Sequence, residues 1–299
     1  MLGEMQASAS VLTSVTRDAL AAVLTVAEQA SRAIMAIYNA PERWAVTEKS
    51  DASPLTAADV AAHECIVHGL GALADTTLAC LPVLSEESSA LAVQARRDWP
   101  AYWLVDPLDG TKEFALVVGH EAVLGVVYGP ASGVGYVAAR GLGSFRIAAK
   151  AADERSSVMA NATEGAALYW QRLQAVAPDW QAAPSALTLT VSRRHGLARL
   201  ATFEQNLSAQ GWQINSIAAG SAFKICAVAE GRAQAYPRFG PTSEWDTAAA
   251  QIVLEEAGGE LVDSRGQRFC YNARNTLLNG DFIAVAGTSA PWLAHWPTP

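Results

Sequence analysis

Charged side chains are scarce in this chain of 299 residues, and basic ones are scarcer than acidic ones. Charged residues make up 17% of the sequence and hydrophobic residues 51%, which argues against extensive disorder. The formal net charge is -8 and the pI is about 5.2. This acidic balance argues against a protein that binds duplex nucleic acid, because such proteins take most of their affinity from basic residues that contact phosphates. An acidic protein can still bind a small anion through a metal ion, a helix N-terminus or a few basic side chains.

Cysteine is also scarce, and the long apolar runs of membrane proteins are missing. The four cysteines are far apart, with no C-x-x-C pair and no histidine at a spacing suited to zinc: Cys65, Cys80, Cys226 and Cys270. We therefore expect free thiols in a reducing compartment. No secretory signal pattern and no run of 18 uncharged apolar residues is found, so we expect a soluble protein. The predicted location is the cytoplasm, with peripheral attachment to the cytoplasmic side of the inner membrane as an open alternative.

Hydrophobic periodicity predicts helices at the N-terminus and strands after them. Apolar residues at helical spacing predict one helix over 14–39 and a second that opens near Thr56. Short apolar runs at 81–88 and 101–110 predict buried strands that end at acidic residues. Glycine-bounded runs between 122 and 147 predict antiparallel strands with tight turns.

A change of composition divides the chain into two halves. Residues 151 to about 185 are rich in Ala, Ser, Asp and Pro and have weak periodicity, except for a predicted helix over 167–177. Strand and helix patterns alternate beyond this segment, which is typical of an α/β unit. We predict an N-terminal α+β domain over 1–184 and a C-terminal α/β domain over 185–299.

The segment D-P-L-D-G-T, residues 106–111, crowds two aspartates into the turn after a buried strand. Asp-Pro and Asp-Gly are ordinary turn dipeptides, so a plain turn is the structural alternative. Pro107 fixes φ, which lets Asp106 and Asp109 converge with the carbonyl of Leu108. Neighbouring carboxylates repel by roughly 4 kcal/mol at 4 Å with an effective dielectric near 20. Mg²⁺ removes that repulsion and prefers such oxygen ligands, so the segment is a candidate metal site.

Further residues extend this candidate site. Glu86 and Glu87 end another predicted strand, and Asp246 lies in the second half of the chain. Gly110 and Thr111 are expected to open a short helix whose N–H groups face a phosphate that bridges two metal ions.

Two aspartates have structural explanations as well. Asp59 lies one turn into a predicted helix, where a negative charge favours the helix dipole. Asp246 follows Ser243 by three positions, an S-x-x-D capping pattern.

The motifs together resemble a known enzyme family. P-V-L-S-E-E-S, W-L-V-D-P-L-D-G-T-K-E-F and W-D-T-A-A resemble the lithium-sensitive, magnesium-dependent phosphatases that include inositol monophosphatase and fructose-1,6-bisphosphatase. K-S-D-A-S-P-L-T-A-A-D, G-S-A-F-K-I-C-A-V-A-E-G and A-Y-P-R-F-G-P-T-S-E-W-D-T-A-A are similar to the 3'(2'),5'-bisphosphate nucleotidase branch. The resemblance runs from about residue 14 to 285. It implies a layered αβαβα sandwich of the inositol monophosphatase and sugar phosphatase type.

The resemblance also implies an activity and its residues. The reaction would be Mg²⁺-dependent hydrolysis of the 3'-phosphate of 3'-phosphoadenosine 5'-phosphate, which removes a by-product of sulfur assimilation and is inhibited by lithium. Two or three Mg²⁺ ions would be held by the matching ligands: Glu86, Asp106, the Leu108 carbonyl, Asp109 and Asp246. The matching catalytic residues are Glu86 and the pair of Thr111 and Asp59, which would orient and deprotonate the attacking water. The alternatives are an inositol or sugar monophosphatase and a non-catalytic metal- or nucleotide-binding relative.

A small bisphosphate nucleotide, rather than a nucleic-acid polymer, would be the partner of a monomer or homodimer. Gly220 and Ser221 are expected to begin an apolar helix whose N–H groups hold an anion, with Lys224 one turn on. Arg238 could clamp a phosphate while the ring of Phe239 covers a base.

Other contacts to this nucleotide are expected at the end of a strand. Ser192 and His195 lie there, in S-R-R-H. The structural alternative for Lys224 and Arg238 is a solvated surface charge, and for His195 a loop or capping histidine.

The chain departs from the family after Phe114. Family members continue there through a basic loop and a further strand before G-V-V-Y, and this chain lacks about one strand of residues, ~10. If the strand is missing, the first sheet must close differently and metal affinity is affected. The chain also has Gly-Ser-Ala at 220–222 where this branch commonly has Gly-Ser-Ser.

Overall fold

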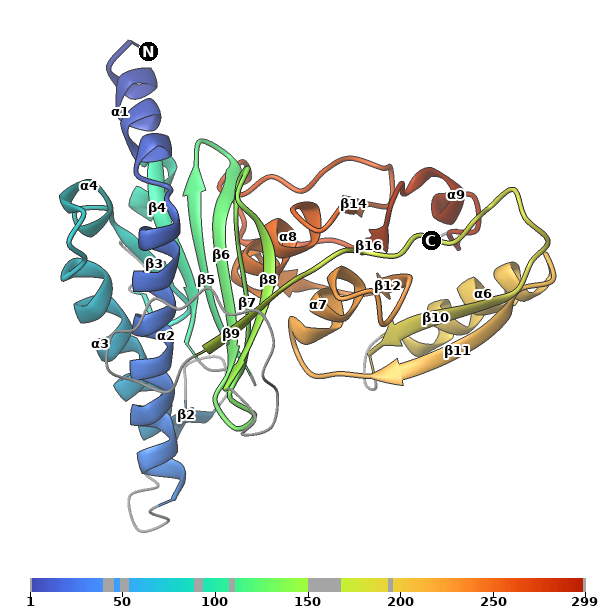
Figure 1. Ribbon diagram of the computed structural model, residues 1–299, viewed down its shortest axis with the longest axis horizontal. Helices are drawn as coiled ribbons and strands as arrows, with labels where there is room; N and C mark the ends of the chain where they lie inside the picture. The colour runs from blue at the N-terminus through green and yellow to red at the C-terminus, as the bar shows by residue number, and fades with distance from the viewer. Residues whose placement is uncertain are drawn as a thin grey trace.

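A computed structural model describes residues 2–39, 46–48, 54–88, 94–107, 111–149, 168–192 and 196–297 of the protein. Figure 1 shows five layers: α2 and α3, a seven-stranded sheet, α7 and α8, a five-stranded sheet, and α6 on the far side. The layered αβαβα sandwich implied by the sequence is therefore confirmed.

The N-terminal half supplies two outer helices and the larger sheet. Its helical elements are α1 (Leu2–Thr13), α2 (Arg17–Tyr38), α3 (Ala57–Gly71), α4 (Thr76–Ala79) and η2 (Arg96–Asp98). Its strands are β1 (Val46–Glu48), β2 (Pro54–Thr56), β3 (Val83–Ser85), β4 (Ala101–Asp106), β5 (Lys112–Val118), β6 (Glu121–Gly129), β7 (Val134–Ala139), β8 (Gly143–Ala149) and β9 (Leu168–Arg172).

The C-terminal half supplies the smaller sheet and the helices on both of its faces. Its helical elements are α6 (Leu197–Ser208), α7 (Phe223–Ala229), η3 (Glu244–Asp246), α8 (Ala248–Glu255) and α9 (Ala290–Leu293). Its strands are β10 (Ala186–Val191), β11 (Gln213–Ala218), β12 (Ala235–Arg238), β13 (Thr242–Ser243), β14 (Gly259–Asp263), β15 (Leu278–Asn279) and β16 (Phe282–Ala286).

The seven-stranded sheet runs from β3 to β9 in chain order, with β3 parallel to β4 and every later pair antiparallel. One face packs on α2 and α3 through residues such as Leu20, Ile66 and Phe114. The opposite face packs on α7 and α8 through residues such as Leu104 and Ile252. Burial on both faces explains why the central strands are apolar almost throughout.

The five-stranded sheet has the order β11-β10-β12-β16-β14. Strand β10 is parallel to both β11 and β12, whereas β16 is antiparallel to β12 and β14. A third apolar core, which includes Leu189, Phe203 and Trp292, fills the space between this sheet and α6 with α9. Each of the two sheets is thus covered by helices on both faces.

The first predicted helix is confirmed as α2, with Thr16 as its N-cap: the Thr16 side chain accepts a hydrogen bond from the Ala19 N–H. By length and composition α2 could also span a membrane, but one side of it is buried against the seven-stranded sheet. The helix predicted over 167–177 is wrong, because β9 occupies 168–172 and pairs with β8. A helix of five residues is unstable because its first turn is costly to form, whereas a strand of five residues is stabilised by hydrogen bonds to the neighbouring strand.

The apparent loss of a strand after Phe114 is resolved by the position of β5. This strand begins at Lys112 and pairs along its whole length with β4 on one side and β6 on the other. The residues Lys112, Glu113 and Phe114 therefore form the first part of the strand themselves. The sheet is continuous from β3 to β9. The residues that this chain lacks relative to the family are therefore missing from the connection between β4 and β5.

The predicted domain boundary falls between the sheets. Strand β9 completes the larger sheet, and β10, which begins at Ala186, is the first strand of the smaller one. The division into 1–184 and 185–299 stays a prediction, since helices α7 and α8 of the second half pack on the sheet of the first.

At Gly125 of β6 the larger sheet packs directly on the backbone of α8. A Cβ atom on this residue would overlap the backbone carbonyl oxygen of Ala249. We expect Gly125→Ala to lower the free energy of unfolding by about 1–3 kcal/mol, because backbone cannot give way as a flexible side chain can. Urea unfolding measures the change. Gly71→Ala is the matched control, since no atom lies within 4 Å of its Cβ position, and an equal loss in both variants would contradict the prediction.

Candidate active site

Two predicted metal ligands lie at neighbouring strand ends. Asp106 is the last residue of β4 and is 1% exposed, and Glu86 comes directly after β3. Because β3 and β4 are parallel, their carboxyl ends meet at the same edge of the sheet. The Glu86 N–H donates to the Val105 carbonyl at 3.3 Å, which holds the two ends together. The sequence prediction that strand ends deliver these carboxylates is confirmed for this pair.

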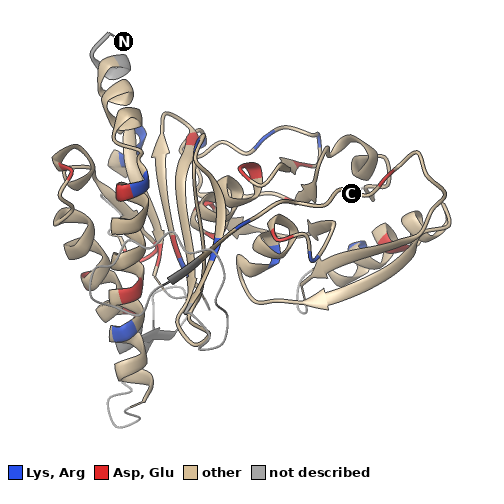
Figure 2. Cartoon of the chain, in the orientation of Figure 1, with Lys and Arg blue, Asp and Glu red and all other residues tan. Residues whose placement is uncertain are grey.

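Glu113 adds a carboxylate that the sequence interpretation missed. It lies directly opposite Asp106 in the β4–β5 ladder and is 2% exposed. Paired residues of an antiparallel ladder point to the same face of the sheet, so the side chains of Asp106 and Glu113 are neighbours. The strands of this sheet are mostly uncharged (Figure 2), which makes the charged start of β5 exceptional.

Thr111 is joined to Glu113 rather than to the expected partner. Its hydroxyl donates to the Glu113 carboxylate at 2.9 Å, and both groups are buried. The expected pairing of Thr111 with Asp59 is therefore not the one that the structure has. The short helix expected to open at Gly110 and Thr111 is also wrong, because the chain enters β5 at Lys112.

Lys112 provides a buried positive charge beside these carboxylates. Its side chain is fully buried, and among the described residues its Nζ has no hydrogen-bond partner. The pKa of Lys112 is lowered to about 7, first because burial removes water from the ammonium group. The negative charges of Asp106, Asp59 and Glu113 oppose this shift. Lys112 thus lies within electrostatic reach of three acidic side chains.

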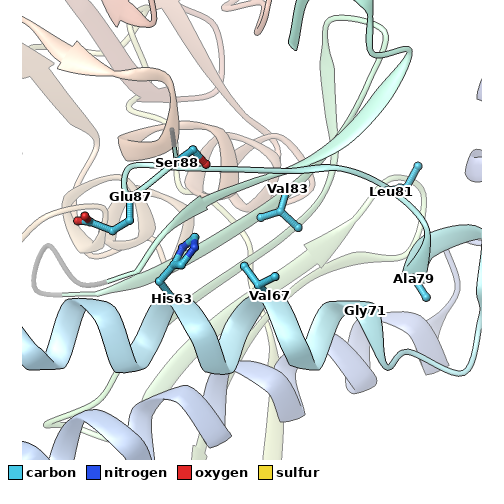
Figure 3. Close-up of a pocket in the computed structure, with 8 residues that line it drawn as sticks. All are labelled: His63, Val67, Gly71, Ala79, Leu81, Val83, Glu87 and Ser88. Atoms are coloured by element: carbon cyan, nitrogen blue, oxygen red, sulfur yellow. The ribbon is translucent and has the colours of Figure 1, made fainter. Parts of the chain in front are cut away.

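Asp59 lies in the first turn of α3, as predicted from the sequence. The same helix is fastened to the end of β3, since His63 Nδ1 lies 3.1 Å from the Ser85 Oγ. A shallow pocket of about 460 Å³ follows this contact between α3 and β3. Figure 3 shows His63 and Glu87 at one end of it and Gly71 at the other. Its polar lining residues, His63, Glu87 and Ser88, come from α3 and from the residues that follow β3.

Asp246 forms the cap that its sequence pattern predicted. The Asp246 carboxylate accepts from the Ser243 N–H at 2.6 Å, and the Ser243 side chain completes the capping box. The adjacent Glu244 is buried, and its carboxylate accepts from the Asn272 N–H at 2.8 Å. Burial raises the pKa of Glu244 above its ordinary value. The cap leaves Asp246 half-buried and lining a cavity, so capping and metal binding are compatible.

The segment that carries Asp246 is tied to the other half of the molecule. Arg96 of η2 is buried and donates to the Asn272 side chain and, at 3.0 Å, to the Arg274 carbonyl. Asn272 in turn donates its backbone N–H to Glu244 of η3. Arg96, which belongs to the N-terminal half, therefore helps to position η3 against β4 and β5.

A cavity of about 580 Å³ joins the two halves next to these carboxylates. Its polar side chains come from both large sheets, from α7, β13 and η3 and from the loops beside them: Glu113, Ser192, Ser221, Lys224, Tyr236, Arg238, Thr242 and Asp246. Arg238 donates to Ser192 Oγ at 3.2 Å and to the Pro241 carbonyl at 3.0 Å. Lys224 is 9% exposed, and its Nζ lies 5.4 Å from the centre of the Tyr236 ring. Lys224 is therefore not a solvated surface charge.

Two expectations about the nucleotide contacts are corrected. The apolar helix begins at Phe223, not at Gly220, and Ser221 precedes it with a positive φ of 37°. Phe239 cannot cover a base in the cavity, because it does not line the cavity and packs instead on Trp296 and Phe203 in the core behind the sheet. Among the described residues, Tyr236 and Phe282 are the aromatic residues that line the cavity, and Tyr236 is the one with a polar hydroxyl.

Four predicted site residues lie outside the described residues: Leu108, Asp109, Gly110 and His195. Among the described residues, no three His, Cys, Asp or Glu side chains are arranged as a preformed metal centre. The chemistry of the donors nevertheless fits a hard cation, because Glu86 and Asp106 meet at one edge and Asp246 reaches the adjoining cavity.

The residues that sequence reasoning missed share one cause. Lys112 and Glu113 follow a turn motif and are charged, and neither feature indicates a buried strand. The sequence did contain a signal for this strand, namely the short distance from Phe114 to the next strand. This distance requires Lys112, Glu113 and Phe114 to form the first part of β5.

Comparisons with known proteins agree with this fold. The chain belongs to the inositol monophosphatase family, whose model matches residues 16–294. Enzymes of this family depend on metal ions. Within the family, this chain is similar to 3'(2'),5'-bisphosphate nucleotidases called CysQ. Those of Escherichia coli K12 and Shigella flexneri are each 40% identical over 87% of this chain and 96% of the relative.

Solved structures give the same result. The crystal structure of CysQ from Bacteroides thetaiotaomicron matches with a TM-score of 0.69 and 32% identity, over 90% of this chain and 97% of that one. A Thermotoga maritima IMPase matches with a TM-score of 0.65 and 19% identity, over 93% and 96%, which shows the shared fold.

Lys112→Met is expected to change how stability depends on pH. Lys112 has a pKa of about 7 in the folded chain and an ordinary value of 10.5. Between these values the unfolded chain holds a proton that the folded chain has released, so this group makes the free energy of unfolding rise with pH. The rise is at most about 1.4 kcal/mol per pH unit, and the variant lacks it.

Urea unfolding of both proteins in EDTA, from about pH 6 to about pH 9, measures the difference. Below pH 7 the gap between them is expected to be constant. A constant gap over the whole range would contradict the prediction.

Proposed function

We propose that the protein is a Mg²⁺-dependent phosphatase that converts 3'-phosphoadenosine 5'-phosphate into AMP and inorganic phosphate. The observation that carries this proposal is the shared cavity, which has Asp246 and Glu113 in its wall together with Lys224 and Arg238. A metal ion held by the acidic residues would bind one phosphate of the substrate, and the basic residues would bind the other phosphate directly. The 40% identity with CysQ nucleotidases supports the same substrate class.

Different residues of the site would bind the metal ions, orient the attacking water and accept its proton. Glu86, Asp106 and Asp246, with Asp109 and the Leu108 carbonyl, would hold two or three Mg²⁺ ions. Bound Mg²⁺ would supply charge neutralisation at the phosphate and a lower pKa of the attacking water. Thr111 would direct that water, and Asp59 stays a candidate for accepting its proton.

The rest of the substrate would lie in the cavity. Lys224 and Arg238 would bind the second phosphate, with Ser192 holding the Arg238 side chain in place. Tyr236 would contact the base or ribose, and its hydroxyl stays protonated because burial raises its pKa to about 12. Gly220, Ser221 and His195 are further candidates at the rim.

The wider setting follows from this activity. We propose a cytoplasmic enzyme that removes a by-product of sulfur assimilation and is inhibited by lithium. Attachment to the inner membrane has no support from the comparisons. An inositol monophosphatase remains the alternative to be separated by substrate tests, because the family includes both activities.

Purified protein with Mg²⁺ is expected to release phosphate from 3'-phosphoadenosine 5'-phosphate faster than from inositol monophosphate. Asp106→Asn is expected to lower kcat by about 100-fold or more with the fold retained, because one charge vanishes while the shape persists. Phosphate release and circular dichroism measure the two effects. Asp179→Asn, a turn residue whose carboxylate accepts from the Gln181 N–H, is the control. Faster release from inositol monophosphate would favour the alternative.

Removing either basic group is expected to weaken binding of the second phosphate. Lys224→Met and Arg238→Gln should each raise KM for 3'-phosphoadenosine 5'-phosphate by about 10-fold or more, the effect of losing one charged hydrogen bond. Inositol monophosphate, which has one phosphate, is the control substrate and should show a smaller change. Steady-state kinetics on both substrates check this. Equal KM changes on both would place these residues at the reacting phosphate instead.

A further inference from the structure

The connection between β4 and β5 is short and brings charged residues into the sheet. Strand β4 ends at Asp106 and β5 begins at Lys112, so only 107–111 lie between them. The register then places Glu113 opposite Asp106. A carboxylate at such a position is costly unless something binds it. Glu113 is buried among central strands that are mostly apolar, so its charge needs a function or a partner.

Alternation along the strand separates Lys112 from its two neighbours. Residues two apart share a face, so Thr111 and Glu113 are directed to one side and Lys112 to the other. Phe114 lies in the core under α2 and α3, which identifies the Lys112 side as the side of α3. Glu113 lies on the opposite side, in the wall of the cavity.

The position of Cys226 in α7 agrees with this assignment. Burial raises the pKa of the Cys226 thiol well above its ordinary value, and the charge of Glu113 contributes to the shift. Glu113 is thus close to the helix layer that separates the two sheets. Asp59 belongs to α3, on the other face.

The hydrogen bond between Thr111 and Glu113 follows from this geometry. Thr111 Oγ1 donates to Glu113 Oε1 at 2.9 Å, with exposures of 1% and 2%. A hydroxyl that donates to a buried carboxylate has its direction fixed, and its lone pairs remain available to accept. Those lone pairs could accept a hydrogen bond from a water molecule next to Asp106.

We propose that Glu113 is the positioning residue that orients the Thr111 hydroxyl toward the attacking water, a part that the family pattern gives to Asp59. This inference rests on the proposed phosphatase activity and deepens it. Glu113 does not touch the reacting atoms. It acts through Thr111, and the short β4–β5 connection of this chain is what places it there.

A double-mutant cycle tests the proposal through kcat. Thr111→Val removes the hydroxyl, and Glu113→Gln removes the charge while keeping the shape. Each is expected to lower kcat for 3'-phosphoadenosine 5'-phosphate about 10-fold or more with KM little changed. If Glu113 acts through Thr111, adding Glu113→Gln to Thr111→Val should lower kcat by less than about twofold further. Thr111→Ser, which restores the hydroxyl, should recover most of the rate and remain sensitive to Glu113→Gln.

A second cycle, between Thr111→Val and Asp59→Asn, measures the competing pair. Independent effects there support the proposal. Coupling between Thr111 and Asp59, with independent effects of Thr111 and Glu113, overturns it. An unchanged kcat in Glu113→Gln also overturns it.

A matched control uses another hydroxyl–carboxylate pair of this chain. Tyr136 donates to Glu230 at 3.0 Å, and neither residue lines the cavity. Tyr136→Phe and Glu230→Gln are expected to alter the urea midpoint and to leave kcat unchanged. A loss of kcat in this pair equal to that at Thr111 and Glu113 would mean that lost stability explains both, and would overturn the proposal.

The test also separates this inference from the proposed function. If the protein hydrolyses inositol monophosphate but not 3'-phosphoadenosine 5'-phosphate, the proposed function fails, and the same cycle is run on inositol monophosphate. If the nucleotide is hydrolysed and the effects of Thr111 and Glu113 multiply independently, only the positioning role of Glu113 fails. Absence of turnover with every phosphate ester overturns both.

Discussion

Two carboxylates, placed side by side at the end of a buried sheet, set the constraint that the surrounding structure satisfies. Asp106 and Glu113 face each other across β4 and β5, where like charges destabilise the pairing of strands. Two groups near them offset the cost of burying these charges: the side chain of Lys112 and the hydroxyl of Thr111. The hydrogen bond to Glu113 also fixes the direction of the Thr111 hydroxyl, which links the burial of the carboxylates to the proposed function.

The fold provides this site with parts from opposite ends of the chain. Parallel strands β3 and β4 bring Glu86 and Asp106 to one edge, and η3 brings Asp246 to the adjoining cavity. The layer of α7 and α8 serves both sheets, so Lys224 and the strand end at Arg238 reach the same cavity from the second half. Acidic and basic side chains thus line one cavity, which suits the substrate with two phosphates of the proposed function.

Much of this was predictable from the sequence, and the failures have physical causes. Strand ends with carboxylates and the capping role of Asp246 follow from local patterns, and the structure has them. The positions of Glu113 and Phe239 depend on which strand pairs with which, a long-range property that residue types do not reveal. Charged residues in β5 contradict local propensity, and only closure of the sheet over a short connection imposes them.

Arg96 adds a final consequence, because its guanidinium group joins Asn272 and the Arg274 carbonyl across the two halves. Asn272 holds Glu244, and Glu244 lies two residues before Asp246. Neither Arg96 nor Asn272 lines the cavity, so a change at either position would act on η3 and Asp246 from a distance, through contacts between the two halves of the chain.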